Sequence, residues 1–265
     1  MTQDRSIPVE PLSPGKVKHA RGLRVVCFLL LVAAGLALRI SYVFIIDPVL
    51  DRDSVLYCEI AEKWHRCGNA CTALESRVGN TDPGYFFLLK KGIDWGFPVM
   101  LWGRIVCIVA SIVFFAAVYG IGRTVFPAYG GELLLLIAIL HPIVGRMAMS
   151  LLRDPVFLAL YAVCFWCILQ ICLKRSLRWV GLFSLSAAAA FLMRYEALEL
   201  LPIFFVVTLG LRKGKRDMLF LLKAWCICML LYIVFCAAFI QMMDIPYGRM
   251  LAGPFKKLET VTTPR

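Results

Sequence analysis

Seven apolar runs account for most of this chain of 265 residues and leave few folds open to it. They are Arg24–Ile46, Phe97–Ile121, Ala128–Val144, Pro155–Leu173, Trp179–Met193, Ala197–Leu211 and Met218–Ile240. The longer runs reach the roughly 20 residues that a helix needs to cross a bilayer. With 61% hydrophobic and 17% charged residues, the composition is that of a membrane protein. We therefore predict an all-α integral membrane fold with about seven transmembrane helices.

The third, fifth and sixth runs are short for a membrane span. The segment Trp179–Leu211 could therefore form one re-entrant hairpin, with Arg194-Tyr195-Glu196 at its tip. The tip emerges on the same face of the membrane whether the segment forms a hairpin or two separate spans.

The short loops predict the orientation. Two of them carry Lys174, Arg175 and Arg178, and Arg212, Lys213, Lys215 and Arg216. Short loops rich in Lys and Arg face the cytoplasm, and long loops count for little. Over the whole chain the two sides are balanced, so the prediction rests on the short loops. It places the N-terminus and these basic loops in the cytoplasm. The ionisable residues Asp51, Asp53, Asp154, Arg194 and Glu196 then all lie on the outer face.

The net charge of +12 could suggest a nucleic-acid ligand. However, the basic residues gather at the ends of apolar runs, where they are typical of topology signals and contacts with anionic lipid. We therefore expect membrane lipids as partners and no nucleic acid.

The long outer loop over 47–96 is predicted to contain juxtamembrane helices. From Ser54 onward, Leu56, Ile60 and Trp64 recur at helical spacing among charged residues. This pattern favours an amphipathic helix in the membrane interface, with Asp53 as its N-cap. Capping is the common use of an aspartate at such a position, but a carboxylate fixed there can also accept a proton from a hydroxyl group.

Histidine and cysteine give little indication of a metal site. His65 and His141 have no partners at ligand spacing, so no metal ligand is predicted. Cys67 and Cys71 share the outer loop. In an oxidising compartment they could form a small disulfide, although their spacing also suits one face of a helix.

Several short motifs follow one another along the chain. In order, these are Arg39, Asp51-Arg52-Asp53-Ser54-Val55-Leu56-Tyr57, Asp82-Pro83-Gly84-Tyr85, Trp102-Gly103-Arg104, Tyr119-Gly120-Ile121-Gly122-Arg123, Arg153-Asp154-Pro155 and Arg194-Tyr195-Glu196. Their order resembles polytopic glycosyltransferases of the GT-C class. It is most similar to dolichyl-phosphate-mannose protein mannosyltransferases and to the bacterial enzymes that add aminoarabinose to lipid A. The resemblance covers about Arg24–Leu211 and is specific only through the combination of motifs.

The resemblance implies that a sugar moves from a polyprenyl-phosphate-linked donor to a glycan, lipid or protein acceptor on the outer face, by an inverting displacement. Asp53 matches the catalytic base, with Asp51 in reserve. Asp154 matches a second acidic residue, which binds a divalent metal ion or orients the acceptor. That metal ion is the one cofactor that the resemblance suggests.

The resemblance also implies a set of substrate-binding residues. Arg194 matches a ligand of the donor phosphate, with Glu196 in the same motif. Arg39 and Arg104 are further candidates for the phosphate, and Tyr57 belongs to the motif around the base. A guanidinium group suits phosphate oxygens and stabilises charge on a leaving group.

The same residues also have simpler interpretations. Arg39 and Arg104 can extend to lipid headgroups. Asp154 before a proline is typical of a helix start. Arg194 and Glu196 can form an ion pair at a tight turn.

The predicted organisation has three segments. A basic cytoplasmic N-terminus over 1–24 precedes a polytopic GT-C-like domain over 25–240, and an outer tail covers 241–265. We expect a multi-pass protein of the bacterial inner (plasma) membrane. Family members run well past the seventh helix, so the chain resembles a truncated or minimal form. The alternative is a non-catalytic or degenerate membrane protein that binds lipid-linked sugar, or a transporter, although no internal repeat supports transport.

Overall fold

The computed structural model describes residues 14–46, 52–68, 83–126, 129–142, 151–210 and 215–243. All regular structure within these ranges is helical. The helices are α1 (Pro14–Ile46), α2 (Arg52–Cys67), α4 (Pro83–Asp94), α5 (Val99–Val125), α6 (Gly130–Leu140), α8 (Asp154–Lys174), α9 (Leu177–Met193), the 3₁₀ helix η2 (Tyr195–Glu199), α10 (Leu200–Gly210) and α11 (Lys215–Met242).

Each of the seven predicted runs contains a helix, which confirms the all-α membrane fold. By length and apolar composition, four of the described helices can cross a membrane, over Gly22–Ser41, Val99–Val125, Asp154–Lys174 and Met218–Met242. α6 and α9 are shorter apolar helices.

Some helix ends differ from the predicted ones. α1 begins at Pro14, well before the apolar run. α6 stops at Leu140 because His141 is extended, as expected of a residue before proline. The sixth run begins with η2 and becomes α-helical only at Leu200.

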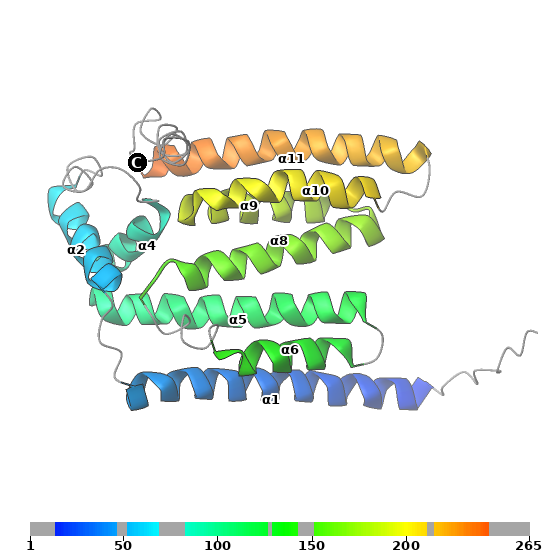
Figure 1. Cartoon of the computed structure of the whole chain (residues 1–265), viewed down its shortest axis with the longest axis horizontal. Helices are drawn as coiled ribbons and strands as arrows, with labels where there is room; N and C mark the ends of the chain where they lie inside the picture. Colours follow the sequence, from blue (N-terminus) through cyan, green and yellow to red (C-terminus); the bar gives the residue numbers. More distant parts are fainter. Residues whose placement is uncertain are drawn as a thin grey trace, which may run out of the picture.

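Successive long helices alternate in direction, so their junctions gather at two ends of one bundle (Figure 1). One end holds α2, α4, the starts of α5 and α8, and the end of α9, which is followed directly by η2. We call it the α2–α4 end. The opposite end holds the α5–α6 and α8–α9 junctions. The fold therefore places Asp53, Asp154, Arg194 and Glu196 at one end, as the alternation of runs predicted.

Three apolar clusters hold the bundle together. One joins α5, α6 and α8 around Phe115, and a second joins α8, α9, α10 and α11 around Phe183 and Phe204. The third joins α2 and α4 to the ends of α9 and α11 around Tyr85 and Phe86. α8 therefore lies between the two larger parts of the core.

α2 is amphipathic, as predicted. Tyr57, Ile60, Ala61 and Trp64 are buried on one face, while Asp53 is exposed. The predicted cap was wrong, however. The helix begins at Arg52, so Asp53 lies in its first turn and not at the N-cap.

Candidate active site

Arg194 forms ion pairs with two carboxylates at the α2–α4 end. Its Nη1 donates to Asp154 Oδ1 at 2.6 Å, and its Nε lies 3.5 Å from Glu196 Oε2. Its Nη2 lies 3.5 Å from the other oxygen of Glu196. The guanidinium carbon is 5.4 Å from the centre of the Phe157 ring. We call Asp154, Arg194 and Glu196 the Arg194 triad.

The local backbone explains this arrangement. α8 starts at Asp154, and Pro155 lies in its first turn. Backbone N–H groups in the first turn have no partner within a helix, so a proline there loses no hydrogen bond. Arg153 takes the N-cap position, so Asp154 is not the cap. α9 ends at Met193, and Arg194 is extended with φ −155° and ψ 130°. This bend turns Arg194 toward the start of α8.

The triad lies at the end of a short apolar helix. The 17 residues of α9 span about 26 Å, less than the roughly 30 Å of a hydrocarbon core. Desolvation lowers the pKa of Arg194, but hydrogen bonds to Glu196 and Asp154 outweigh it and raise the pKa above its ordinary value. The guanidinium therefore stays charged, and the triad carries a formal charge of about −1.

Tyr161 and Glu199 form a second polar contact beside the triad. The Tyr161 hydroxyl donates to Glu199 Oε1 at 2.7 Å, which joins α8 to η2. The sequence interpretation missed this pair. The signal was an acidic residue inside the sixth apolar run, since charge at membrane depth usually has a function.

Asp53 and Tyr57 lie on α2, apart from the triad in sequence but at the same end of the bundle (Figure 1). Asp53 is exposed and makes no ion pair within the described part of the chain. Tyr57 is buried, with its ring 5.5 Å from Tyr85 and 5.2 Å from Phe86. Asp51 lies outside the described residues, as does Cys71.

The two other predicted arginines are not brought to the triad. Arg39 is only 3% exposed, and its guanidinium lies 4.3 Å from the centre of Phe115 in the packing of α1 against α5. Its Nε and Nη2 have no hydrogen-bond partner among the described residues. Arg104 is exposed on α5. The structure therefore gives neither arginine a contact with the Asp154 carboxylate.

A further ion-pair group links α2 to α4. Asp94 accepts from His65 Nδ1 at 2.8 Å and from Lys90 Nζ at 2.6 Å, and Lys91 lies 3.7 Å away. Desolvation raises the pKa of Asp94, but hydrogen bonds from Lys90 and His65 outweigh it and lower the pKa below 3.8. Because His65 lies on α2 and Asp94 on α4, the contact between them joins the two helices.

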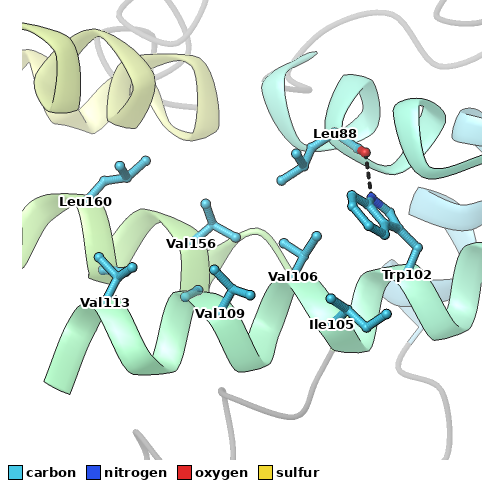
Figure 2. Close-up of a pocket in the computed structure, with 10 residues that line it drawn as sticks. Leu88, Trp102, Ile105, Val106, Val109, Val113, Val156 and Leu160 are labelled. Carbon is cyan, nitrogen blue, oxygen red and sulfur yellow. Dashed lines mark hydrogen bonds between the residues drawn. The ribbon is translucent and has the colours of Figure 1, made fainter. Parts of the chain in front are cut away.

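A groove of about 310 Å³ lies between α4, α5 and α8 (Figure 2). Its lining is entirely apolar apart from Trp102, whose indole N–H is bonded to the Leu88 carbonyl at 2.9 Å. Val156 and Leu160 line it from α8, whereas Asp154 and Tyr161 point from another side of that helix. The groove and the triad are thus separated by the first turns of α8.

Among the described residues, no group of three or more His, Cys, Asp or Glu side chains is arranged to hold a metal ion. The metal role of Asp154 therefore remains a prediction from the resemblance.

Comparison with known protein families identifies the chain. The sequence profile described as dolichyl-phosphate-mannose-protein mannosyltransferase matches residues 84–240. No curated protein and no solved structure matches significantly. The matched range includes Arg104, the Arg194 triad, Tyr161 and Glu199, whereas Asp53 and Arg39 precede it. Since the profile covers more than half of the chain, this membrane protein belongs to the dolichyl-phosphate-mannose-protein mannosyltransferase family and is a glycosyltransferase of the GT-C type.

Proposed function

We propose that the protein transfers a sugar from a polyprenyl-phosphate-linked donor to an acceptor on the outer face of the membrane, with inversion at the anomeric carbon. The observation that carries this proposal is the Arg194 triad, a partly exposed guanidinium held beside two carboxylates where the apolar helix α9 ends and α8 begins. Charged groups at such a depth are costly and usually functional.

Arg194 is suited to bind the donor phosphate along one edge. Asp154 holds Nη1 at 2.6 Å, whereas Glu196 lies 3.5 Å from both Nε and Nη2. The contact with Glu196 is the weaker one by its length. A phosphate can therefore displace Glu196 and take the Nε and Nη2 edge as a two-point ligand, while Asp154 keeps the guanidinium in place.

The apolar groove supports a lipid-linked donor. Its lining of Val, Ile, Leu and Ala side chains suits a hydrocarbon chain (Figure 2). A hydrocarbon chain in the groove would contact Val156, which is only two residues from Asp154 of the triad. The phosphate at the end of that lipid would reach the triad over the first turn of α8.

Asp53 remains our proposed base because its carboxylate makes no ion pair within the described part of the chain, whereas Asp154 is held by Arg194. In the proposed step, the acceptor hydroxyl oxygen bonds to the anomeric carbon and its proton passes to Asp53. The bond from that carbon to the phosphate oxygen breaks, and Arg194 stabilises the charge that develops on the phosphate.

Transfer by the full chain in proteoliposomes tests this proposal. The donors are polyprenyl phosphates that carry a radiolabelled sugar, and the acceptors are lipid, protein and glycan fractions. Asp53→Asn should reduce transfer by about 10²- to 10⁴-fold while the protein still binds the donor. Arg178→Gln, an exposed change at the opposite end, serves as the control.

Near wild-type transfer by folded Asp53→Asn would reject Asp53 as the base. Donor binding without transfer by the wild-type protein would instead favour the non-catalytic alternative. Failure of the wild-type protein to bind any of the labelled donors would contradict the whole proposal.

A further inference from the structure

The Tyr161–Glu199 pair continues the polar row that begins at the Arg194 triad. On α8, Asp154, Phe157 and Tyr161 are spaced so that they share one face of the helix. The Arg194 guanidinium carbon lies 5.4 Å from the Phe157 ring, and that ring lies 5.3 Å from the Tyr161 ring. The Phe157 ring therefore lies between the proposed phosphate site at Arg194 and the Tyr161–Glu199 pair.

The pair is placed where a ligand can reach it. Glu199 is exposed and Tyr161 is partly exposed. Tyr161 occupies one carboxylate oxygen of Glu199 at 2.7 Å, and the other oxygen makes no hydrogen bond among the described residues. The carboxylate is thus fixed in direction but keeps the capacity to accept further hydrogen bonds.

The charge of the row limits what can bind at this position. Among the described contacts, Asp154 and Glu196 pair with Arg194, whereas Glu199 is bonded to a neutral tyrosine, so the negative charge of Glu199 is not balanced by an ion pair there. A second phosphate would be repelled by Glu199, which has no cation beside it among the described residues. A group that donates hydrogen bonds and has an apolar face fits the carboxylate and the neighbouring rings.

We propose that Glu199 and Tyr161 form the part of the site that recognises the hydroxyl groups of the sugar on the lipid-linked donor. Glu199 accepts hydrogen bonds from the sugar, Tyr161 holds the carboxylate in position, and Phe157 separates this position from the phosphate at Arg194. This inference rests on the proposed donor class, but it does not require that transfer occurs.

Binding measurements on the full chain in detergent or nanodiscs test the proposal. The probes are dolichyl phosphate without sugar, dolichyl-phosphate mannose and dolichyl-phosphate glucose. The wild-type protein should bind at least one glycosylated probe more tightly than the sugar-free lipid. Glu199→Gln should reduce this difference by about ten- to a hundredfold, the usual effect of losing a hydrogen bond to a charged group. Affinity for dolichyl phosphate alone should stay within about twofold.

The opposite end of the bundle offers a matched control. There the Tyr119 hydroxyl donates to Glu132 Oε1 at 3.2 Å and links α5 to α6. Tyr119→Phe and Glu132→Gln remove the same kind of contact and should leave the preference for glycosylated lipid unchanged. Tyr161→Phe keeps the ring and serves as a second test if Glu199→Gln is poorly folded.

The outcomes separate this inference from the proposed function. Retention of the full preference in both Glu199→Gln and Tyr161→Phe would overturn the inference, even if the wild-type protein transfers sugar. Loss of the preference in these variants would support it, even if no transfer is detected. Equal binding of all three probes by the wild-type protein would also overturn it.

Discussion

The two ends of the bundle use polar residues differently. At the α2–α4 end, Asp154 and Glu196 flank Arg194, while Glu199 accepts a hydrogen bond from Tyr161. At the opposite end, Lys174, Arg175 and Arg178 lie exposed around the α8–α9 junction. Basic residues in short loops set orientation and contact lipid headgroups. The ion pairs at the α2–α4 end are not needed to orient the protein, and charged groups beside apolar helices cost free energy of desolvation. They therefore point to ligand binding.

Both ends also use a glycine to bring two helices close together. At the α2–α4 end, a Cβ on Gly84 would lie 2.7 Å from the Leu192 carbonyl oxygen, two residues before Arg194. At the opposite end, a Cβ on Gly122 would collide with the Gly130 carbonyl, where α5 meets α6. The same packing device therefore supports the site at one end and a plain helix junction at the other.

The largest expected contrast between the ends concerns Arg194. Arg194→Lys keeps the charge but removes the planar group that holds Asp154 and Glu196 together. Loss of a two-point contact with phosphate should weaken binding of dolichyl phosphate by about ten- to a hundredfold. Arg178→Lys at the opposite end should have no such effect. Equal affinities of the two variants in a titration would remove Arg194 from the phosphate site.

Glycine substitutions give a smaller and more specific contrast. Gly84→Ala and Gly122→Ala should each destabilise the protein by about 1–3 kcal/mol, because the added methyl group meets backbone atoms. Only Gly84→Ala should also weaken donor binding, since the displaced Leu192 precedes Arg194. Thermal unfolding and lipid titration of both variants measure the two effects.

Gly181→Ala is the neutral control for this pair, because nothing lies within 4 Å of the added Cβ. Its stability should be unchanged or slightly higher, as is usual for alanine in a helix. If Gly122→Ala weakens donor binding as much as Gly84→Ala does, the two ends are not functionally distinct.

The smallest predicted effect concerns acid. The pKa of Asp94 in the folded protein is lowered below 3.8. The ion pairs of Asp94 therefore stabilise the α2–α4 junction fully at pH values above the ordinary pKa of an aspartate. This stabilisation is lost as the pH falls through the lowered pKa of Asp94. Since the pairs are partly exposed, they contribute less than about 1 kcal/mol. Hydrogen exchange should show acid loosening of α2 in the wild-type protein and a flatter profile in Asp94→Asn. Identical profiles would exclude the Asp94 pairs as the cause.

The sequence predicted the helices and their alternation better than the contacts within the site. Long apolar runs specify spans through composition alone, so α5, α8 and α11 appear where the runs do. The pairing of Arg194 with Glu196 was predicted because the two residues are close in the chain. Asp154 was placed at the same end, but its 2.6 Å bond to Arg194 depends on how α8 packs against α9.

Other features depend on tertiary packing that the sequence does not reveal. Arg39 resembled a phosphate ligand, yet it packs over Phe115, a contact set by the approach of α1 to α5. The Tyr161–Glu199 bond joins residues 38 positions apart, and it forms because the chain bends into η2 immediately after Arg194. Only the placement of an acidic residue in an apolar run signalled it in advance.

The most direct test of the central claim is to find where the lipid-linked sugar binds. A polyprenyl-phosphate sugar with a photoreactive group near the phosphate can be crosslinked to the full chain in proteoliposomes, and the labelled peptides identified by mass spectrometry. Labelling should fall within 151–161 and 194–200 and should be abolished by excess unlabelled donor. Competed labelling at 119–132 or 174–178 would place the donor at the opposite end of the bundle and contradict the account.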